Sequence, residues 1–115
     1  MTKNGKQGYV YVICDPQNEG LFKIGVTRGS IERRMKALQT GNPDEIFLAK
    51  CFETDDPYFL EKQLHLRYRD YHVNGEWYDL NTERLSKFAD YCQQIEEMRE
   101  SLKDNPFFNK KSKRG

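Results

Sequence analysis

The chain has 115 residues, of which 32% are charged and 37% hydrophobic, and its formal net charge is +1. This length suits one domain with a single modest core. No segment approaches the roughly 18 uninterrupted apolar residues of a membrane span, and residues 1–6 lack the apolar run of a signal peptide. We therefore expect a soluble cytoplasmic protein that has no membrane partner.

The predicted elements begin with two strands, at residues 8–13 and 21–27, joined by turn-forming residues at 15–20. Ser30 caps a helix over residues 31–39, whose apolar positions recur at helical spacing. Residues 46–52 are nearly all apolar and predict a third, central strand. Asp55-Asp56-Pro57 begins a second helix that extends to about residue 70.

The second half of the chain predicts one short extended piece and one long helix. A turn within residues 73–80 leads into the extended piece, and Asn81 or Thr82 opens the helix, which extends to Lys103. This order indicates an α/β fold of the α+β sandwich type, with a small, mostly antiparallel three-stranded sheet flanked by helices. We expect a flexible N-terminus (1–8), a domain (9–80), a C-terminal helix packed on it (81–105) and a basic disordered tail (106–115).

The three cysteines, Cys14, Cys51 and Cys92, lie far apart in apolar segments. An odd number without paired spacing argues against a disulfide framework. A zinc site formed by Cys14, Cys51, His65 and His72 would lack the paired ligand spacing of such sites. The cysteines are therefore expected to be buried thiols.

The charged residues are unevenly distributed along this nearly neutral chain. Basic residues gather after the second strand, whereas acidic residues gather in the last helix. These groups are Arg28, Arg33, Arg34 and Lys36 on the basic side, and Glu96, Glu97 and Glu100 on the acidic side. This uneven distribution of charge suits local binding of a phosphate backbone. A solvated surface of mixed charge is the alternative.

Three motifs together resemble the GIY-YIG nuclease superfamily. Tyr9-Val10-Tyr11 matches the first motif, and Lys23-Ile24-Gly25 matches the second with lysine in place of tyrosine. A basic helix follows, as in that superfamily, and the resemblance covers roughly residues 9–80. Gly75-Glu76-Trp77-Tyr78, which follows a helix with Leu60-Glu61-x-x-Leu64-His65, is similar to a phage-encoded branch often described as a DNA-binding domain.

The resemblance implies a catalytic role for four residues. Tyr11 would orient or deprotonate the attacking water, with Lys23 as a nearby positive charge that also contacts the scissile phosphate. Arg34 would grip a phosphate through two hydrogen bonds, and Glu61 would bind Mg²⁺ or Mn²⁺. Considered singly, these residues also fit ordinary structural roles: a packed tyrosine, solvent-facing basic side chains and a glutamate in a helix salt bridge.

Further residues are assigned to DNA contact or left open. Arg28, Arg33, Lys36 and His65 are candidate DNA-binding residues. Glu76 or Tyr78 could face the site, and Trp77 could fill the core. The superfamily's late asparagine has no secure match; Asn81 lies near the right place and is not assigned.

The register of the first two strands decides whether Tyr11 and Lys23 share a face. If Cys14 pairs with Gly20, Tyr11 falls opposite Lys23, whereas a slip of one residue turns the two side chains to opposite faces. The sequence does not fix this register.

Three functions remain open at this point. The first is a metal-dependent DNA endonuclease, with double-stranded DNA favoured as substrate and RNA as an alternative. The second is a DNA-binding module of the same fold that does not cleave. The third is a protein-interaction or inhibitor domain that forms a homodimer through helix 82–103. A phage origin, which would place the protein in the host cytoplasm, is inferred from the superfamily's distribution.

Overall fold

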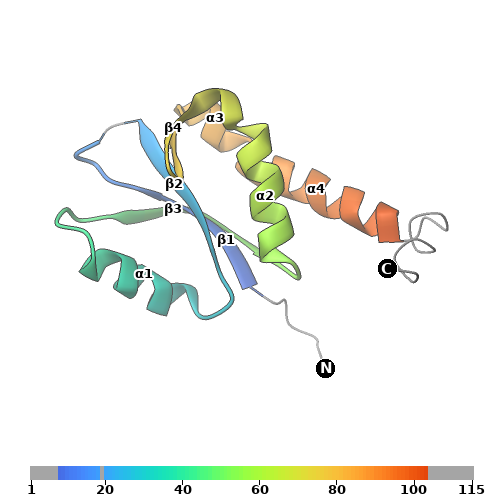
Figure 1. Ribbon diagram of the computed structural model, residues 1–115, viewed down its shortest axis with the longest axis horizontal. Helices are drawn as coiled ribbons and strands as arrows, with labels where there is room; N and C mark the ends of the chain where they lie inside the picture. Colours follow the sequence, from blue (N-terminus) through green and yellow to red (C-terminus); the bar gives the residue numbers. More distant parts are fainter. Residues whose placement is uncertain (1–7, 19, 104–115) are drawn as a thin grey trace.

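The computed structural model describes residues 8–18 and 20–103. The predicted tail 106–115 and all of the predicted flexible segment 1–8 except Gly8, which begins the first strand, lie outside the described residues. Within them the chain forms five strands, four α-helices and one turn of 3₁₀ helix at Arg69–Tyr71 (Figure 1). The elements are β1 Gly8–Cys14, β2 Leu21–Thr27, α1 Ile31–Thr40, β3 Phe47–Thr54, α2 Pro57–Arg67, β4 His72–Asn74, β5 Trp77–Asp79, α3 Thr82–Ser86 and α4 Phe88–Lys103.

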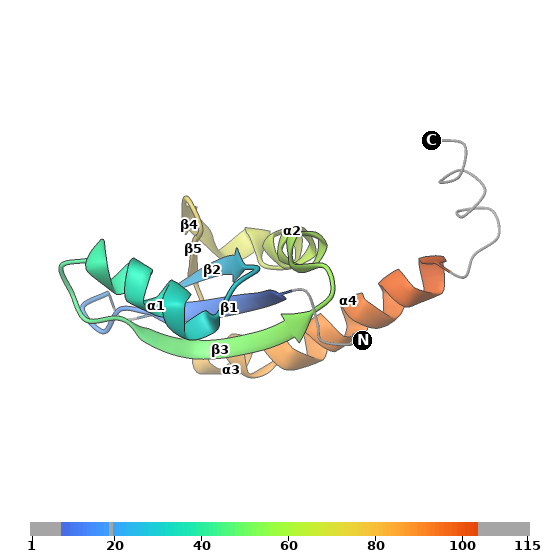
Figure 2. The same ribbon diagram turned by 90° about the horizontal axis from the view of Figure 1, so that it is seen from below.

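The five strands form one antiparallel sheet in the order β3-β1-β2-β5-β4. Helix α1 covers one face of the sheet, while α2 and α4 pack on the other face (Figures 1 and 2). The fold is thus an α+β arrangement of three layers. The C-terminal half of α4 projects past the end of the sheet (Figure 2).

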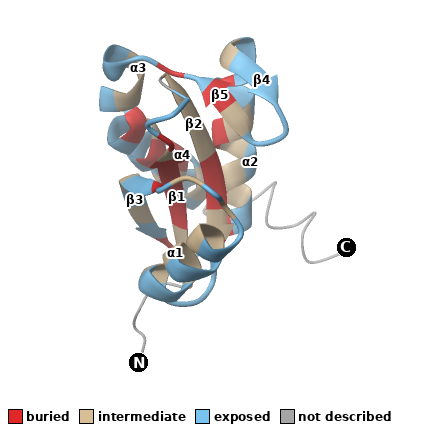
Figure 3. Cartoon of the chain, turned by 90° about the vertical axis from the view of Figure 1, so that its left-hand side faces the viewer, coloured by how far each residue is buried: buried red, intermediate tan, exposed pale blue. Residues whose placement is uncertain are grey.

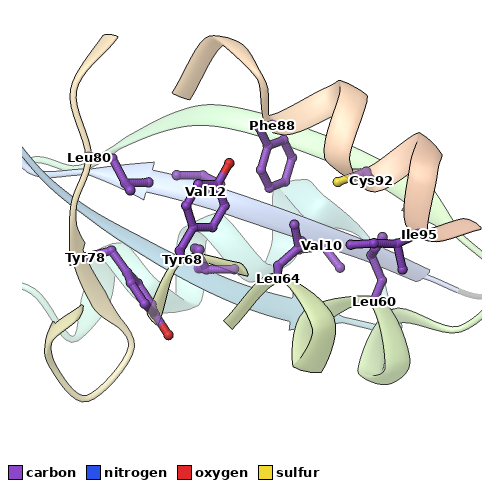
Figure 4. Close-up of a cluster of buried hydrophobic side chains, with 11 residues drawn as sticks. Val10, Val12, Leu60, Leu64, Tyr68, Tyr78, Leu80, Phe88, Cys92 and Ile95 are labelled. Carbon is purple, nitrogen blue, oxygen red and sulfur yellow. The ribbon is translucent and has the colours of Figure 1, made fainter. Parts of the chain in front are cut away.

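The main core lies between the sheet and the helices α2 and α4. Buried residues run along the middle of β1 (Figure 3), and Val10 and Val12 point towards this core (Figure 4). Its buried members are Val10, Val12, Ile24, Leu60, Leu64, Tyr68, Tyr78, Leu80, Phe88, Cys92 and Ile95. Because side chains alternate along a strand, Tyr11 and Ile13 face the other way. They form a smaller cluster with Ile46 under α1.

The predicted helix starts are confirmed at atomic detail. The backbone N–H of Arg33 donates to Ser30 Oγ (3.1 Å), and that of Phe59 donates to Asp56 Oδ1 (3.1 Å). Asn81 Oδ1 accepts from the N–H of Arg84 (2.7 Å), so this asparagine caps α3. Each side chain satisfies a backbone donor that the first turn leaves unpaired.

Three predictions about the elements are wrong. The sheet has five strands because residues 72–79 form a hairpin, β4–β5, where one extended piece was expected. The apolar strand β3 is an edge strand, and Phe47 and Leu48 are exposed. The single helix 82–103 is interrupted at Lys87, whose backbone N–H bonds to the Arg84 carbonyl.

The cysteines are free, as expected, but only Cys92 is fully buried. Cys51 lies exposed on the edge strand β3, and Cys14 is half-buried. Burial raises the pKa of the Cys92 thiol to about 12.

The pairing of β1 with β2 determines where Tyr11 lies. Cys14 pairs with Phe22, so Tyr11 stands opposite Gly25 and Lys23 stands opposite Ile13. Lys23 and Tyr11 therefore share a face of the sheet. A Cβ at Gly25 would lie 2.6 Å from the Tyr11 hydroxyl oxygen and 2.7 Å from the ring carbon that bears it. The missing side chain of Gly25 thus makes room for the Tyr11 ring.

We predict that Gly25→Ala destabilises the fold by about 1–3 kcal/mol, because the added methyl group overlaps a ring that is only 3% exposed. Urea unfolding measures this change. Gly29→Ala is the matched control, since a Cβ there meets only the Thr27 hydroxyl, at 3.9 Å. Equal stability of the two variants would show that the Tyr11 ring moves aside freely.

Candidate functional site

The site begins at an opening in the sheet beside β2. Strand β5 pairs with β2 only from Leu21 to Lys23. The next backbone bond, from the N–H of Ile24 to the carbonyl of Glu76 (3.1 Å), closes the pairing. Among the described residues no strand covers the same edge from Gly25 to Thr27, so side chains from both faces of the sheet can meet there.

The β4–β5 hairpin brings a carboxylate to this opening. Its two-residue turn consists of Gly75, at φ +51°, and Glu76, a turn in which glycine supplies the left-handed backbone. The backbone bond to Ile24 holds Glu76 beside β2. Its carboxylate lies 3.9 Å from the Lys23 ammonium, and both side chains are partly exposed.

Helix α2 contributes two further groups on adjacent turns. His65 Nε2 lies 3.3 Å from Glu61 Oε2, and His65 Nδ1 is hydrogen-bonded to the Tyr78 hydroxyl. Glu61 and His65 are four residues apart, which places them on one helix face. The Tyr78 ring is buried at one end of the main core with its hydroxyl directed outward (Figure 4).

Tyr11 joins the two halves of the site electrostatically. Burial is the largest effect on its phenol and raises its pKa above 10.0. The Arg34 guanidinium opposes this shift, whereas the carboxylates of Glu76 and Glu61 reinforce it. Arg34 of α1 is therefore a positive charge that acts on Tyr11. The sequence had suggested Lys23 for this role, but Lys23 pairs with Glu76.

Two adjoining hollows extend the site along the inner side of α1, and Ala37 lines both. Thr27, Ser30, Arg33 and Arg34 line one hollow at the start of the helix. Lys23 and Trp77 line the other with Leu38 and Ile46. Lys23 lines one hollow, and Arg33 and Arg34 line the other. The two hollows, here called the groove along α1, therefore have cationic side chains that can bind phosphate.

The structure brings together Tyr11, Lys23, Arg34 and Glu61, which come from four elements and are distant in sequence. The candidate DNA contacts lie differently. Arg28, Arg33 and Lys36 are exposed around the start of α1, and the Arg28 guanidinium lies 5.0 Å from the centre of the exposed Tyr58 ring. His65 instead lies within the Glu61 cluster.

Glu76 and Tyr78 are part of this site, although no specific role was assigned to them from the sequence. Asn74-Gly75 is a strong short signal for a hairpin, although the turn itself forms one residue later, at Gly75-Glu76, with Asn74 in β4. The contact of Tyr78 with His65 follows from the packing of α2 on β5, which no local pattern predicts.

The residues at the opening are chemically suited to a divalent cation. Within the described part of the chain, Glu61, His65 and Glu76 form a group whose potential ligand atoms all lie within 4.8 Å of one another. Carboxylate oxygens suit Mg²⁺ and Mn²⁺, and imidazole suits transition metals. The cysteines, by contrast, do not join any such group among the residues that the structure describes.

Acidic residues gather between β3 and α4. Glu53 of β3 and Glu96, Glu97 and Glu100 of α4 line a hollow there. Glu96 is also structural, because its carboxylate accepts a hydrogen bond from the buried Thr54 hydroxyl (2.8 Å). A polyanion would be repelled from this side and attracted to the side of α1.

Sequence comparison places the chain among known proteins. The model of the T5orf172 domain matches residues 8–93, which include every residue of the site described above. The chain belongs to the T5orf172 domain family. The T5orf172 match starts at β1 and ends within α4, so it covers the whole sheet and the helices α1, α2 and α3.

One viral protein is similar to this T5orf172 domain. The chain is 31% identical over 90 residues to "Uncharacterized protein 460R" of Invertebrate iridescent virus 6. The alignment covers 74% of this chain but only 40% of the viral protein. No solved structure matches the chain. Within the described residues, every helix is too short or too polar to cross a membrane.

We predict that the T5orf172 domain loses stability as the pH rises from about 9 to about 11, and that Tyr11→Phe loses less. The unfolded chain releases the phenolic proton near pH 10, whereas burial keeps it bound in the folded state. The unfolded state then binds fewer protons, so the free energy of unfolding falls with pH. Urea unfolding at a series of pH values measures how steeply the free energy of unfolding falls with pH.

Tyr58→Phe, at an exposed tyrosine, is the control for this measurement. A Tyr11→Phe slope equal to that of the control would contradict a raised pKa at Tyr11.

Proposed function

We propose that this T5orf172 domain is a GIY-YIG-type, metal-dependent endonuclease that binds DNA and hydrolyses its phosphodiester bonds. The main support is the meeting of Tyr11, Lys23, Arg34 and Glu61 at the open part of the β2 edge. Membership of a phage-type family of nuclease-like or nucleic-acid-binding character agrees with this proposal.

The cations would hold the substrate. Arg34 lies half-buried at the start of α1, where its guanidinium can contact two phosphate oxygens. Lys23 is 27% exposed and can turn from Glu76 to a phosphate. The exposed Arg28, Arg33 and Lys36 would add contacts that carry affinity without sequence information.

Tyr11 would position the attacking water as a neutral phenol. Burial raises its pKa, which favours the neutral phenol, and this form can donate a hydrogen bond to the water. The Tyr11 ring is fixed by burial against Gly25, so the hydroxyl is held in place before substrate arrives.

Glu61 would hold the divalent cation, Mg²⁺ or Mn²⁺. When bound, the ion supplies charge stabilisation at the phosphoryl oxygens. Glu61 is only partly exposed and is accompanied by His65 and Glu76, so the residues around it fit such an ion.

We predict that the protein nicks supercoiled plasmid in the presence of Mg²⁺ or Mn²⁺, and that Glu61→Gln lowers the rate at least about a hundredfold, as expected for loss of an essential charged group. Tyr11→Phe should also slow cleavage without abolishing DNA binding. Glu97→Gln, a change of equal chemistry on the acidic side, should cleave like the wild type.

Two results would contradict the proposal in different ways. Cleavage that Glu61→Gln leaves unchanged would contradict the assigned site. Absence of wild-type cleavage, together with DNA binding that weakens with salt and with Arg33→Ala, would instead indicate a DNA-binding module on the same fold.

A further inference from the structure

We propose that Glu61, His65 and Glu76 form one three-ligand site that prefers divalent transition-metal ions, with Mn²⁺ as the probe, over Mg²⁺. This inference deepens the proposed function, because it names two further ligands and the class of ion at the same opening. Its first basis is distance: one ligand atom from each residue lies within 4.8 Å of the other two.

The three ligands are held by different parts of the fold. Glu61 and His65 project from successive turns of α2, a helix anchored by the fully buried Leu60 and Leu64. Glu76 arrives on the β4–β5 turn and is fixed by its carbonyl bond with the Ile24 N–H. Rigid elements thus preset the approach of the side chains, and small rotations bring their atoms to the separations of ligands on one ion.

Tyr78 supports the use of His65 as a ligand. A phenolic hydroxyl can donate or accept a hydrogen bond. Without an ion, His65 Nε2–H can donate to Glu61 while Nδ1 accepts from Tyr78. With an ion, the imidazole proton resides on Nδ1 and is donated to the Tyr78 oxygen, which leaves the Nε2 lone pair for the metal. Metal-bound histidines characteristically have such a partner on the second nitrogen.

Lys23 opposes cation binding at this site. Its ammonium lies 3.9 Å from a Glu76 carboxylate oxygen. A cation at the cluster and the Lys23 ammonium therefore compete for Glu76. If the metal takes Glu76, Lys23 is released towards the groove along α1.

The ligand set determines the choice of metal. Mg²⁺ strongly prefers oxygen ligands and retains its waters, so an imidazole contributes little to Mg²⁺ binding. Transition-metal ions accept nitrogen ligands readily. One imidazole beside two carboxylates therefore favours transition-metal ions.

The test measures metal binding in the absence of DNA. The EPR signal of free Mn²⁺ falls on binding, and quenching of Trp77, the single tryptophan and the neighbour of Glu76, gives a second readout. We expect Glu76→Gln and His65→Gln each to weaken Mn²⁺ binding about tenfold or more, and Tyr78→Phe about tenfold. Lys23→Met should tighten Mn²⁺ binding several-fold, because a competing charge is removed.

Mg²⁺ binding is measured by competition with Mn²⁺, and Glu97→Gln is the control for the loss of an exposed carboxylate. His65→Gln should leave Mg²⁺ affinity close to that of the wild type. Circular dichroism of each variant checks that loss of binding is not loss of folding.

The outcomes distinguish this inference from the proposed function. If Glu61→Gln loses Mn²⁺ binding while Glu76→Gln and His65→Gln keep it, the three-ligand site is overturned, but Glu61 remains the metal ligand of the proposed nuclease. Mn²⁺ binding that depends on all three residues, in a protein that does not cut DNA, would support the site and contradict the nuclease. Wild-type affinity in all variants would overturn both metal assignments.

Discussion

The contact of the Tyr11 ring with Gly25 is the constraint on which the site depends. It requires β1 and β2 to pair with Tyr11 opposite Gly25, and this register also places Lys23 on the same face, opposite Ile13. A shift of one residue would move Tyr11 into the space now filled by the main core. The same strand pairing therefore places the main core on one face of the sheet and the side chains of Tyr11 and Lys23 on the other.

Sequence reasoning predicted what local rules determine. The caps Ser30 and Asp56 confirm helix starts that depend on a few neighbouring residues. The prediction that β3 is a central strand was wrong, because an apolar run does not reveal whether a strand lies at the centre or at the edge of a sheet. The register of β1 with β2 and the approach of Glu76 to β2 depend on pairing between separate strands, which local patterns do not determine.

The distribution of charge divides the molecule into two sides with different roles. The side of α1 has a shallow groove lined by the cationic side chains of Lys23, Arg33 and Arg34. On the other side, the Glu96 carboxylate accepts a hydrogen bond from Thr54 and forms an ion pair with Arg99. The acidic residues of that side therefore contribute partly to the packing of α4. A nearly neutral protein can thus attract a polyanion to one side and repel it from the other.

The most direct test of this account is the location of DNA on the protein. NMR spectra of ¹⁵N-labelled Glu61→Gln protein, titrated with a short DNA duplex, would report which backbone amides sense the ligand. The account predicts shifts in β2 from Lys23 to Thr27 and at the start of α1, with residues 96–100 of α4 unchanged. Shifts concentrated on α4, or none at all, would contradict it.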